Sequence, residues 1–233
     1  MFAARSSVDA VVAAIDKLGV QAKVSVASVN GPKSVVVAGA QAELAAVLAE
    51  LGQEGKWLSV SHAFHSPLML PMADTFRSVL QSMDMSPCAI PLASTVTGTL
   101  IMPGESIGVE HWVRQVSEPV LFSTALDVAL GALNEDAPMV SALLELGPNP
   151  VLTRMAKSWV TKKTNRNLSW HASLDRKADI DDIAAIMRAQ NGLVELRSMV
   201  ELFPQKKSFP WSQLPHPLLQ YREAIDQDLT HYK

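Results

Sequence analysis

The sequence contains little cysteine, few charges and no long apolar run. A single cysteine, Cys88, excludes an internal disulfide framework and is typical of a reducing compartment. No uninterrupted apolar stretch reaches membrane-spanning length, and the first ten residues lack the apolar core of a signal peptide. The net charge of −3 gives no reason to expect nucleic acid or an anionic membrane as a partner. These absences predict a soluble, cytoplasmic protein.

Apolar side chains, in contrast, are plentiful. Of the 233 residues, 48% are hydrophobic and 18% are charged, which is more apolar and less charged than an average soluble domain. The length allows one large domain or two small ones. The composition predicts a filled core and, in addition, a surface that is buried against a partner.

The first sixty residues predict a small α+β unit. Ser7 can cap a helix whose apolar residues recur with helical spacing. Alternating apolar residues and an Asn30-Gly31-Pro32 turn predict a hairpin. The expected strands are 2–5, 24–29, 34–38 and 56–61, and the expected helices are 8–18 and 42–51. The order strand, helix, strand, strand, helix, strand is that of a ferredoxin-like unit.

The next hundred residues predict a mixture of helices and strands. A face of Met and Leu side chains predicts a helix over 68–83, most simply as core packing. The further expected helices are 110–116, 121–133 and 151–159, and the expected strands are 87–96 and 139–146, the second of them buried. Cys88 fits a small core residue better than a nucleophile.

From residue 165 the pattern changes. A helix is expected over 179–199, and the aspartates at its start suit the helix dipole better than a metal site. Four prolines then alternate with aromatic residues between 203 and 217, which forbids a helix. The aromatics favour an extended strap that docks on a folded surface, and a disordered tail is the alternative.

Two histidines three residues apart, His62 and His65, carry the clearest chemical signal. They lie where the expected strand 56–61 ends, in the run SVSHAFHSPLM at 59–69. Histidine is suited to general-base catalysis because its pKa lies near neutrality. The spacing alone favours a structural histidine at a strand end. A metal site is a poor interpretation because no further ligands lie nearby.

Several blocks along the chain resemble the acyltransferase domains of modular type I polyketide synthases. They are HAFHS at 62–66, NGP at 30–32, SVVVAG at 34–39, FRSVL at 76–80, TVTG at 95–98, EHWVRQVSEPVLF at 110–122 and LELGPNPVL at 144–152. The resemblance covers nearly the whole chain in the expected order. Several blocks in sequence are more specific than any single short motif.

The resemblance implies an α/β fold in three parts. Residues 1–61 would form a ferredoxin-like small subdomain, and residues 62–164 the C-terminal part of an α/β-hydrolase-like large subdomain. Residues 165–233 would form a helix and an extended Pro-rich linker. The family's nucleophile is a serine in a Gly-His-Ser-x-Gly elbow, and this chain contains no Gly-His-Ser-x-Gly. We therefore expect the elbow before Met1, in an N-terminal half that would be the first partner of this chain.

The resemblance also implies an activity. A malonyl-type extender unit would pass from CoA to an acyl carrier protein by ping-pong transfer, with His65 as general base. Malonyl-CoA would be the substrate and the phosphopantetheine of the carrier protein the acceptor. No tightly bound cofactor or metal is expected. The carrier protein and an adjacent ketosynthase would be further partners.

Three more residues receive a role from the resemblance. His62 and Phe64 match positions that correlate with extender choice, and HAFH is associated with malonyl units. Phe64 would fill the space that an α-methyl group needs, although it also fits an ordinary buried aromatic. Asn30 would form a hydrogen bond near the substrate or the histidine, although its turn explains it equally well. A backbone carbonyl at or near Leu121 would orient the histidine ring.

Two other interpretations stay open at this point. The chain would be a non-catalytic docking module if the ferredoxin-like unit and the strap only bind a carrier protein or a ketosynthase. Alternatively, the half with the nucleophile is a separate polypeptide, or it was removed. In either of these cases the incomplete sheet would leave apolar strand edges exposed.

Overall fold

The structure, a computed structural model, describes all residues except 53, 132–139, 141, 165–167 and 174–233. The chain divides into two units, Met1–Asp179 and Ile180–Lys233, and every described residue lies in the first unit. The expected helix over 179–199 and the expected Pro-rich linker lie outside the described residues.

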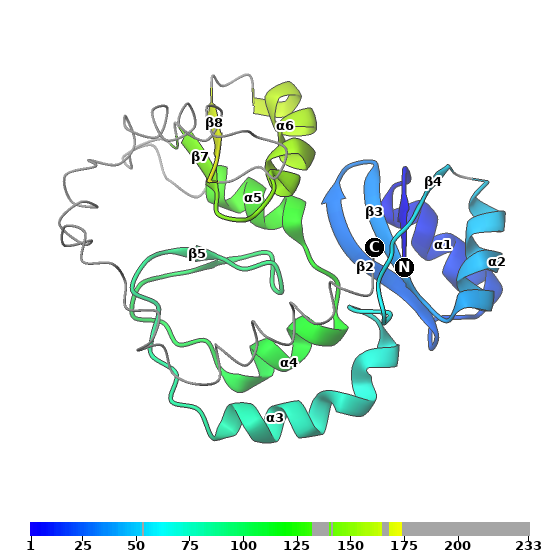
Figure 1. Cartoon of the computed structure of the whole chain (residues 1–233), viewed down its shortest axis with the longest axis horizontal. Helices are drawn as coiled ribbons and strands as arrows, with labels where there is room; N and C mark the ends of the chain where they lie inside the picture. The colour runs from blue at the N-terminus through cyan, green and yellow to red at the C-terminus, as the bar shows by residue number, and fades with distance from the viewer. Residues whose placement is uncertain (53, 132–139, 141, 165–167, 174–233) are drawn as a thin grey trace, which may run out of the picture. The chain divides into compact units, whose positions relative to one another are not determined.

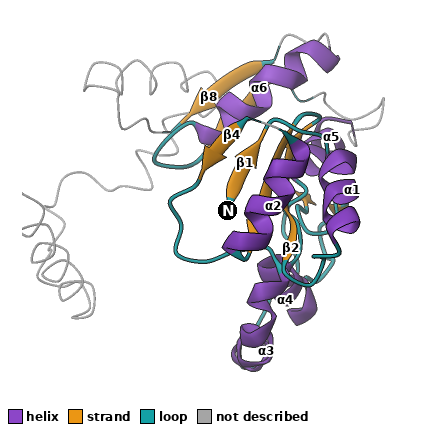
Figure 2. Ribbon diagram, turned by 90° about the vertical axis from the view of Figure 1, so that its right-hand side faces the viewer, coloured by secondary structure: helices purple, strands orange, loops and turns teal. Residues whose placement is uncertain are grey.

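A four-stranded antiparallel sheet with two helices on one face forms from the first 57 residues (Figures 1 and 2). Its elements are β1 (Phe2–Ala4), α1 (Val8–Leu18), β2 (Val24–Gly31), β3 (Ser34–Gly39), α2 (Gln41–Leu51) and β4 (Gly55–Trp57). The strand order is β2-β3-β1-β4, and each neighbouring pair is antiparallel. This is the element order that the sequence predicted.

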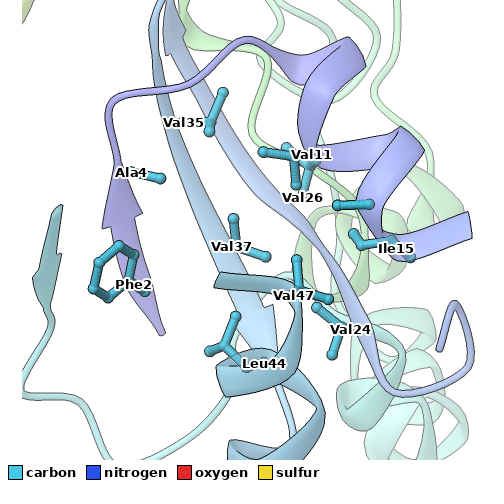
Figure 3. Packing of buried hydrophobic residues seen from close by; sticks show 11 residues of the cluster. Phe2, Ala4, Val11, Ile15, Val24, Val26, Val35, Val37, Leu44 and Val47 are labelled. Atoms are coloured by element: carbon cyan, nitrogen blue, oxygen red, sulfur yellow. The ribbon is translucent and has the colours of Figure 1, made fainter. Parts of the chain in front are cut away.

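The helices are fixed to the sheet by branched apolar side chains (Figure 3). Alternate residues of β2 and β3 point towards the helices, because successive side chains of a strand point to opposite faces. The buried cluster consists of Phe2, Ala4, Val11, Ala14, Ile15, Val24, Val26, Val35, Val37, Leu44 and Val47. The cluster therefore occupies one face of the sheet only.

Helix α1 begins and ends where the sequence predicted. The backbone N–H of Ala10 donates to the Ser7 hydroxyl oxygen at 3.3 Å, which satisfies one free amide of the first turn. The helix ends at Gly19, whose φ of 64° is a left-handed conformation that glycine adopts without strain.

The second face of the sheet is partly covered by the segment that follows β4. Ala27, Val36 and Ala38 are buried there, and Leu58 and Ala63 pack against them. Strand β4 ends at Trp57, so the prediction of a strand over 56–61 was wrong beyond that residue. Trp57 pairs with Phe2, the first residue of β1, and no partner strand remains for the residues that follow.

Residues 67–131 form short elements. They are the 3₁₀ helix η1 (Pro67–Met72), α3 (Ala73–Gln81), β5 (Leu92–Ala93), β6 (Leu100–Ile101), α4 (Val109–Ser117) and α5 (Phe122–Gly131). The helix predicted over 68–83 is divided, because Pro71 has no N–H for a helical hydrogen bond. The strand predicted over 87–96 is only two residues long. Cys88 instead pairs its backbone with Gly104 and Glu105, and its free thiol belongs to a half-buried residue.

The last described part is a β-α-β unit. Strands β7 (Ala142–Glu145) and β8 (Ser169–Ala172) are parallel, and α6 (Val151–Thr164) connects them along the chain. The strand β8 was not predicted. The prediction of a buried strand over 139–146 was wrong about burial, because Leu144 is 40% exposed and Leu146 is 81% exposed.

Glu145 holds the start of α6. Its carboxylate accepts hydrogen bonds from the backbone N–H groups of Val151, Leu152 and Thr153 at 3.0, 3.0 and 2.8 Å. Partial burial raises the pKa of the Glu145 carboxyl, but these amide hydrogen bonds outweigh burial, and the pKa lies below its ordinary value. The charged carboxylate thus acts as the cap of α6 from the end of a neighbouring strand.

We expect Glu145→Gln to lower the free energy of unfolding by about 0.5–2 kcal/mol at pH 7, as loss of a helix cap does. A carboxyl whose pKa is lowered by folding stabilises the protein above its unfolded pKa of about 4.3, and this contribution disappears as pH falls through the folded pKa. Urea denaturation between pH 7 and 3.5 should therefore show that the free energies of unfolding of Glu145→Gln and of the unsubstituted chain converge as the pH falls. Glu118→Gln, at an exposed ion pair, is the control and should change little. If the difference in the free energy of unfolding between the two stayed constant with pH, the charged Glu145 carboxylate would not be the cap of α6.

Candidate active site

His65 lies in a left-handed backbone conformation. Its φ is 57°, and among the described residues it is the only one other than glycine with a positive φ. Such a conformation is strained for a residue with a Cβ and persists only where the surroundings hold it. Strain of this kind is concentrated at functional sites. The backbone therefore singles out the same histidine that the sequence predicted as the general base.

The last turn of α4 holds His65. The backbone N–H of His65 donates to Val116 O at 3.0 Å, and the ring Nδ1 lies 2.8 Å from Gln115 O. The last carbonyls of a helix lack partners within the helix, so both are free to accept. A carbonyl can only accept, so Nδ1 carries the proton and Nε2 carries the lone pair. No described residue forms a hydrogen bond with Nε2, and the residue is half-buried.

Gln115, not Leu121, supplies the orienting carbonyl. The prediction from the resemblance was therefore wrong by six residues. The Leu121 carbonyl instead accepts from the N–H of Ala125 in α5 at 2.9 Å, and the Leu121 N–H donates to Thr95 O at 2.7 Å. Only the end of a helix exposes a row of free carbonyls, and the sequence does not show which of them the ring meets.

The residues on both sides of His65 are fixed as well. The Ser66 hydroxyl is fully buried, donates to Ala63 O at 2.6 Å and accepts from Leu68 N–H at 3.3 Å. The Ser25 hydroxyl on β2 donates to His65 O at 3.3 Å. The histidine is thus attached to β2 and to α4 at the same time.

Strand β2 is joined to the α4–α5 connection along its outer edge. Val29 N–H donates to Val120 O at 2.8 Å, and Val120 N–H donates to Ala27 O at 2.9 Å. The pairing of β2 with β3 shifts register on both sides of this contact, so Ala27 and Asn30 each lie in a β-bulge. Bulges change the direction of a side chain and are common beside active sites.

Asn30 is held at two atoms. The Ser28 hydroxyl donates to Asn30 Oδ1 at 2.5 Å, and Trp159 Nε1–H of α6 donates to Asn30 O at 3.0 Å. The indole of Trp159 packs against Gly31, where a Cβ would lie 2.9 Å from its Cδ1. Within the described part of the chain no hydrogen bond joins Asn30 to His65, so the expected contact between them is not formed.

His62 and Phe64 lie together just before His65. Their rings are tilted at 5.7 Å between centroids, and the Phe64 residue is 39% exposed. His62 is exposed, and its Nδ1 lies 2.8 Å from the Ser61 hydroxyl. Phe64 is thus not an ordinary buried aromatic. Its exposed ring can contact a ligand, and its role in extender choice stays a prediction.

One serine motif was not recognised in the sequence. The looser pattern Gly-x-Ser-x-Gly occurs at 104–108, between β6 and α4. Ser106 lies in an exposed loop before α4, whereas Gln115 lies near the other end of this nine-residue helix, about 10 Å further on at 1.5 Å per residue. The φ of Ser106 is not positive, whereas the serine of a nucleophile elbow lies in a strained turn. The motif is therefore not placed to pair with His65.

Other kinds of site receive no support from the described residues. There, no group of three or more His, Cys, Asp or Glu side chains is positioned to hold a metal ion. In the same residues, no helix is both long and apolar enough to cross a membrane. An apolar pocket of about 220 Å³ lies between α5, β7 and α6, and none of its lining residues is one of the predicted site residues.

The chain belongs to the acyl transferase domain family. The sequence profile of this family, described as the acyl transferase domain, matches residues 3–191. Polyketide synthase GfsB of Streptomyces halstedii is 40% identical over 137 residues, which are 58% of this chain and 2% of that protein. The PKS-NRPS hybrid synthetase ATPKS of Aspergillus niger is 30% identical over 227 residues, which are 91% of this chain and 11% of that protein.

A solved structure agrees with this assignment. The crystal structure of the acyltransferase domain from the second module of the salinomycin polyketide synthase matches with a TM-score of 0.70 and 30% identity. The match covers 92% of this chain and 48% of that chain. This chain therefore spans about half of the solved domain and a small part of the curated relatives. The family and the mixed α/β fold are those that the sequence predicted.

We expect Gly31→Ala to lower the free energy of unfolding by about 1–3 kcal/mol, as overpacking of a core does. The added methyl would lie 2.9 Å from Trp159 Cδ1 and force the indole away from Asn30. Chemical denaturation measures the change. Gly131→Ala is the matched control, because its added Cβ meets nothing within 4 Å. Equal stabilities of the two variants would show that the Trp159 contact does not constrain Gly31.

Proposed function

We propose that this chain supplies the general base of an acyltransferase site in a polyketide synthase, and the side chain of Phe64 that limits the choice of extender unit. The site loads a malonyl-type extender unit from CoA onto an acyl carrier protein, through an ester on a serine outside this chain. The observation that carries the proposal is the geometry of His65. Its Nδ1–H donates a hydrogen bond to Gln115 O, and its Nε2 has no hydrogen-bond partner among the described residues.

The chemistry has two halves. In the first, Nε2 of His65 takes the serine proton while the serine oxygen bonds to the thioester carbon; the C–S bond then breaks, and the CoA sulfur leaves with that proton. In the second, Nε2 takes the proton of the phosphopantetheine thiol while its sulfur bonds to the acyl carbon; the C–O bond to the serine then breaks, and the serine oxygen leaves with that proton. The hydrogen bond from Nδ1–H to Gln115 O holds the ring and stabilises the imidazolium formed in each half.

The division of the chain follows from the same proposal. Residues 1–61 correspond to the ferredoxin-like small subdomain, residues 62–164 to the C-terminal part of the large subdomain, and residues 165–233 to a helix and linker. Strand β8, at the start of this last part, pairs with β7 of the large subdomain. The partners are the N-terminal half of the domain, a ketosynthase and the carrier protein. The β2-β3-β1-β4 order and the family match over residues 3–191 support this division.

A docking module is the second candidate. Among the described residues, 18 large apolar side chains are exposed, and they favour this candidate because a contiguous apolar surface usually contacts another protein. The strained His65 has no role in a docking module, however, and therefore favours catalysis.

We expect His65→Asn to reduce acyl transfer by about 10²–10⁴-fold, the usual contribution of a general base. Asn tolerates the left-handed conformation, so the fold should be kept. The assay is malonyl transfer from labelled malonyl-CoA to a carrier protein. It uses a hybrid domain in which this chain replaces the matching part of the salinomycin module-two acyltransferase domain.

Ser106→Ala in the same hybrid domain is the control and should keep full activity. The isolated chain should form no labelled acyl ester. A labelled ester that Ser106→Ala abolishes would contradict the proposal. If His65→Asn prevented assembly of the hybrid domain but left malonyl transfer unchanged, the docking module would be favoured.

We expect Phe64→Ser to relax the choice of extender unit. Removing the ring makes room for an α-methyl group, and one methyl group in a pocket is worth about 1–3 kcal/mol. The ratio of methylmalonyl to malonyl transfer, measured as kcat/KM in the hybrid domain, should rise by about 10-fold or more. Val60→Ser, at a 44% exposed apolar residue of the same segment, is the control. An unchanged ratio in Phe64→Ser would show that Phe64 does not select the extender unit.

A further inference from the structure

The Ser66 hydroxyl forms two hydrogen bonds whose directions are both fixed by the partner. The Ala63 carbonyl can only accept, so the hydroxyl proton lies in the bond to Ala63 O at 2.6 Å. The Leu68 N–H can only donate, so the hydroxyl oxygen accepts it at 3.3 Å. Ser66 is fully buried, and both bonds are therefore shielded from solvent at this residue. Among side chains of this size, a hydroxyl is the group that donates and accepts strongly through one atom.

The two bonds enclose His65 along the chain. Ala63 precedes the histidine and Leu68 follows it, so the hydroxyl closes the backbone around His65 into a turn and joins this turn to η1. Pro67, the first residue of η1, has no N–H, and Leu68 N–H is therefore the first amide of η1 that needs a partner. Helix η1 packs against α4, whose last turn carries Gln115 O.

The backbone of His65 requires bonds that hold it. A φ of 57° is unfavourable for a residue with a Cβ and persists only where the surroundings over-determine it. The bond to Val116 O and the bond from the Ser25 hydroxyl come from other elements, and Ser25 is only half-buried. The Ser66 hydroxyl, in contrast, acts within the turn itself and is fully buried. The turn that contains His65 is thus closed by the side chain of the next residue.

The geometry points to Ser66 as a positioning residue that holds His65 in its left-handed conformation and thereby aims Nδ1 at Gln115 O. The inference rests on the proposed function, in which His65 is the general base. Without the hydroxyl, His65 relaxes towards the ordinary backbone regions, and its ring leaves the Gln115 carbonyl. The two ring nitrogens then share the proton, and Nε2 no longer holds a lone pair in every molecule. Ser66 acts through His65, because its own hydroxyl is already used by Ala63 and Leu68.

The structural claim is tested on the full 233-residue chain without any assay of activity. At about pH 8, where imidazole side chains are ordinarily neutral, we expect the ring ¹⁵N signals of His65 to show one tautomer, with the proton on Nδ1. Ser66→Ala should move both signals towards the average of the two tautomers. His65→Asn identifies the signals by their loss. Ring signals that are identical in Ser66→Ala and in the unsubstituted chain would overturn the inference.

The matched control is Ser82→Ala. The Ser82 hydroxyl also donates to a carbonyl three residues earlier, Val79 O, at 2.7 Å, but it is exposed and lies at the end of α3. It should leave the His65 signals unchanged. An equal shift in Ser82→Ala would show that loss of any such bond disturbs the ring, and would overturn a specific role for Ser66.

The functional claim is tested in the hybrid domain. A displaced base slows the chemical step and leaves substrate binding intact, so Ser66→Ala should lower kcat about 10- to 100-fold and change KM for malonyl-CoA by less than about 2-fold. In the His65→Asn background, Ser66→Ala should lower kcat by less than a further factor of about 2, because no imidazole remains to be positioned. A role in folding alone would lower kcat by the same factor in both backgrounds.

Two further variants separate the hydroxyl from the space that it fills. Ser66→Thr keeps the hydroxyl, and the extended backbone at this position suits a β-branched residue, so it should restore kcat and the ring signals. Ser66→Cys fills a similar space but forms only weak hydrogen bonds, so it should resemble Ser66→Ala. Full activity of Ser66→Cys would show that packing is sufficient and would overturn the inference, whether or not the larger threonine is accommodated.

The outcomes also separate this inference from the proposed function. Equal losses of kcat on Ser66→Ala with and without His65, or a raised KM with unchanged kcat, would overturn the positioning role and leave His65 as the base. Full activity of His65→Asn would overturn the proposed function, whereas the ring signals would still test whether Ser66 holds His65.

Discussion

The pairing of β2 with Val120 is the contact on which the rest of the site depends. An outer strand of a sheet has unpaired N–H and C=O groups, and here Ala27 and Val29 use theirs to bind the connection between α4 and α5. Val120 lies only a few residues after the last turn of α4, so this contact also sets the position of Gln115 and Val116. These carbonyls hold His65. A sheet edge thereby determines where an imidazole lies.

The same part of β2 has an irregular course. The register of β2 with β3 shifts on both sides of Ser28, the residue that bridges to Val120. One bulge leaves Asn30 out of the ladder, where Ser28 and Trp159 hold it. The opposite end of the strand reaches His65 O through Ser25. Both groups of the proposed site are thus anchored to one strand.

The sequence predicted the elements that depend on local pattern. Helix α1 has its bounds as expected because Ser7 and Gly19 mark its ends, and the β2-β3 hairpin follows from its alternation and its turn. The errors have a common cause: a local pattern of residues does not show which partner a strand will have. Strand β4 stops at Trp57 because its antiparallel partner β1 begins at Phe2, and apolar β7 is exposed because β8 is its only partner in the described sheet. The positive φ of His65 and the carbonyl of Gln115 leave no trace in residue types, since both are properties of the backbone.

The carboxylate of Glu145 has an effect on what α6 can bind. The start of a helix commonly attracts phosphate groups, because its first amides point outward with a partial positive charge. In α6 the chain's own side chain already satisfies three of these amides and neutralises that charge. A nucleotide phosphate would find this end of the helix occupied by an internal anion, so the start of α6 is not a phosphate site.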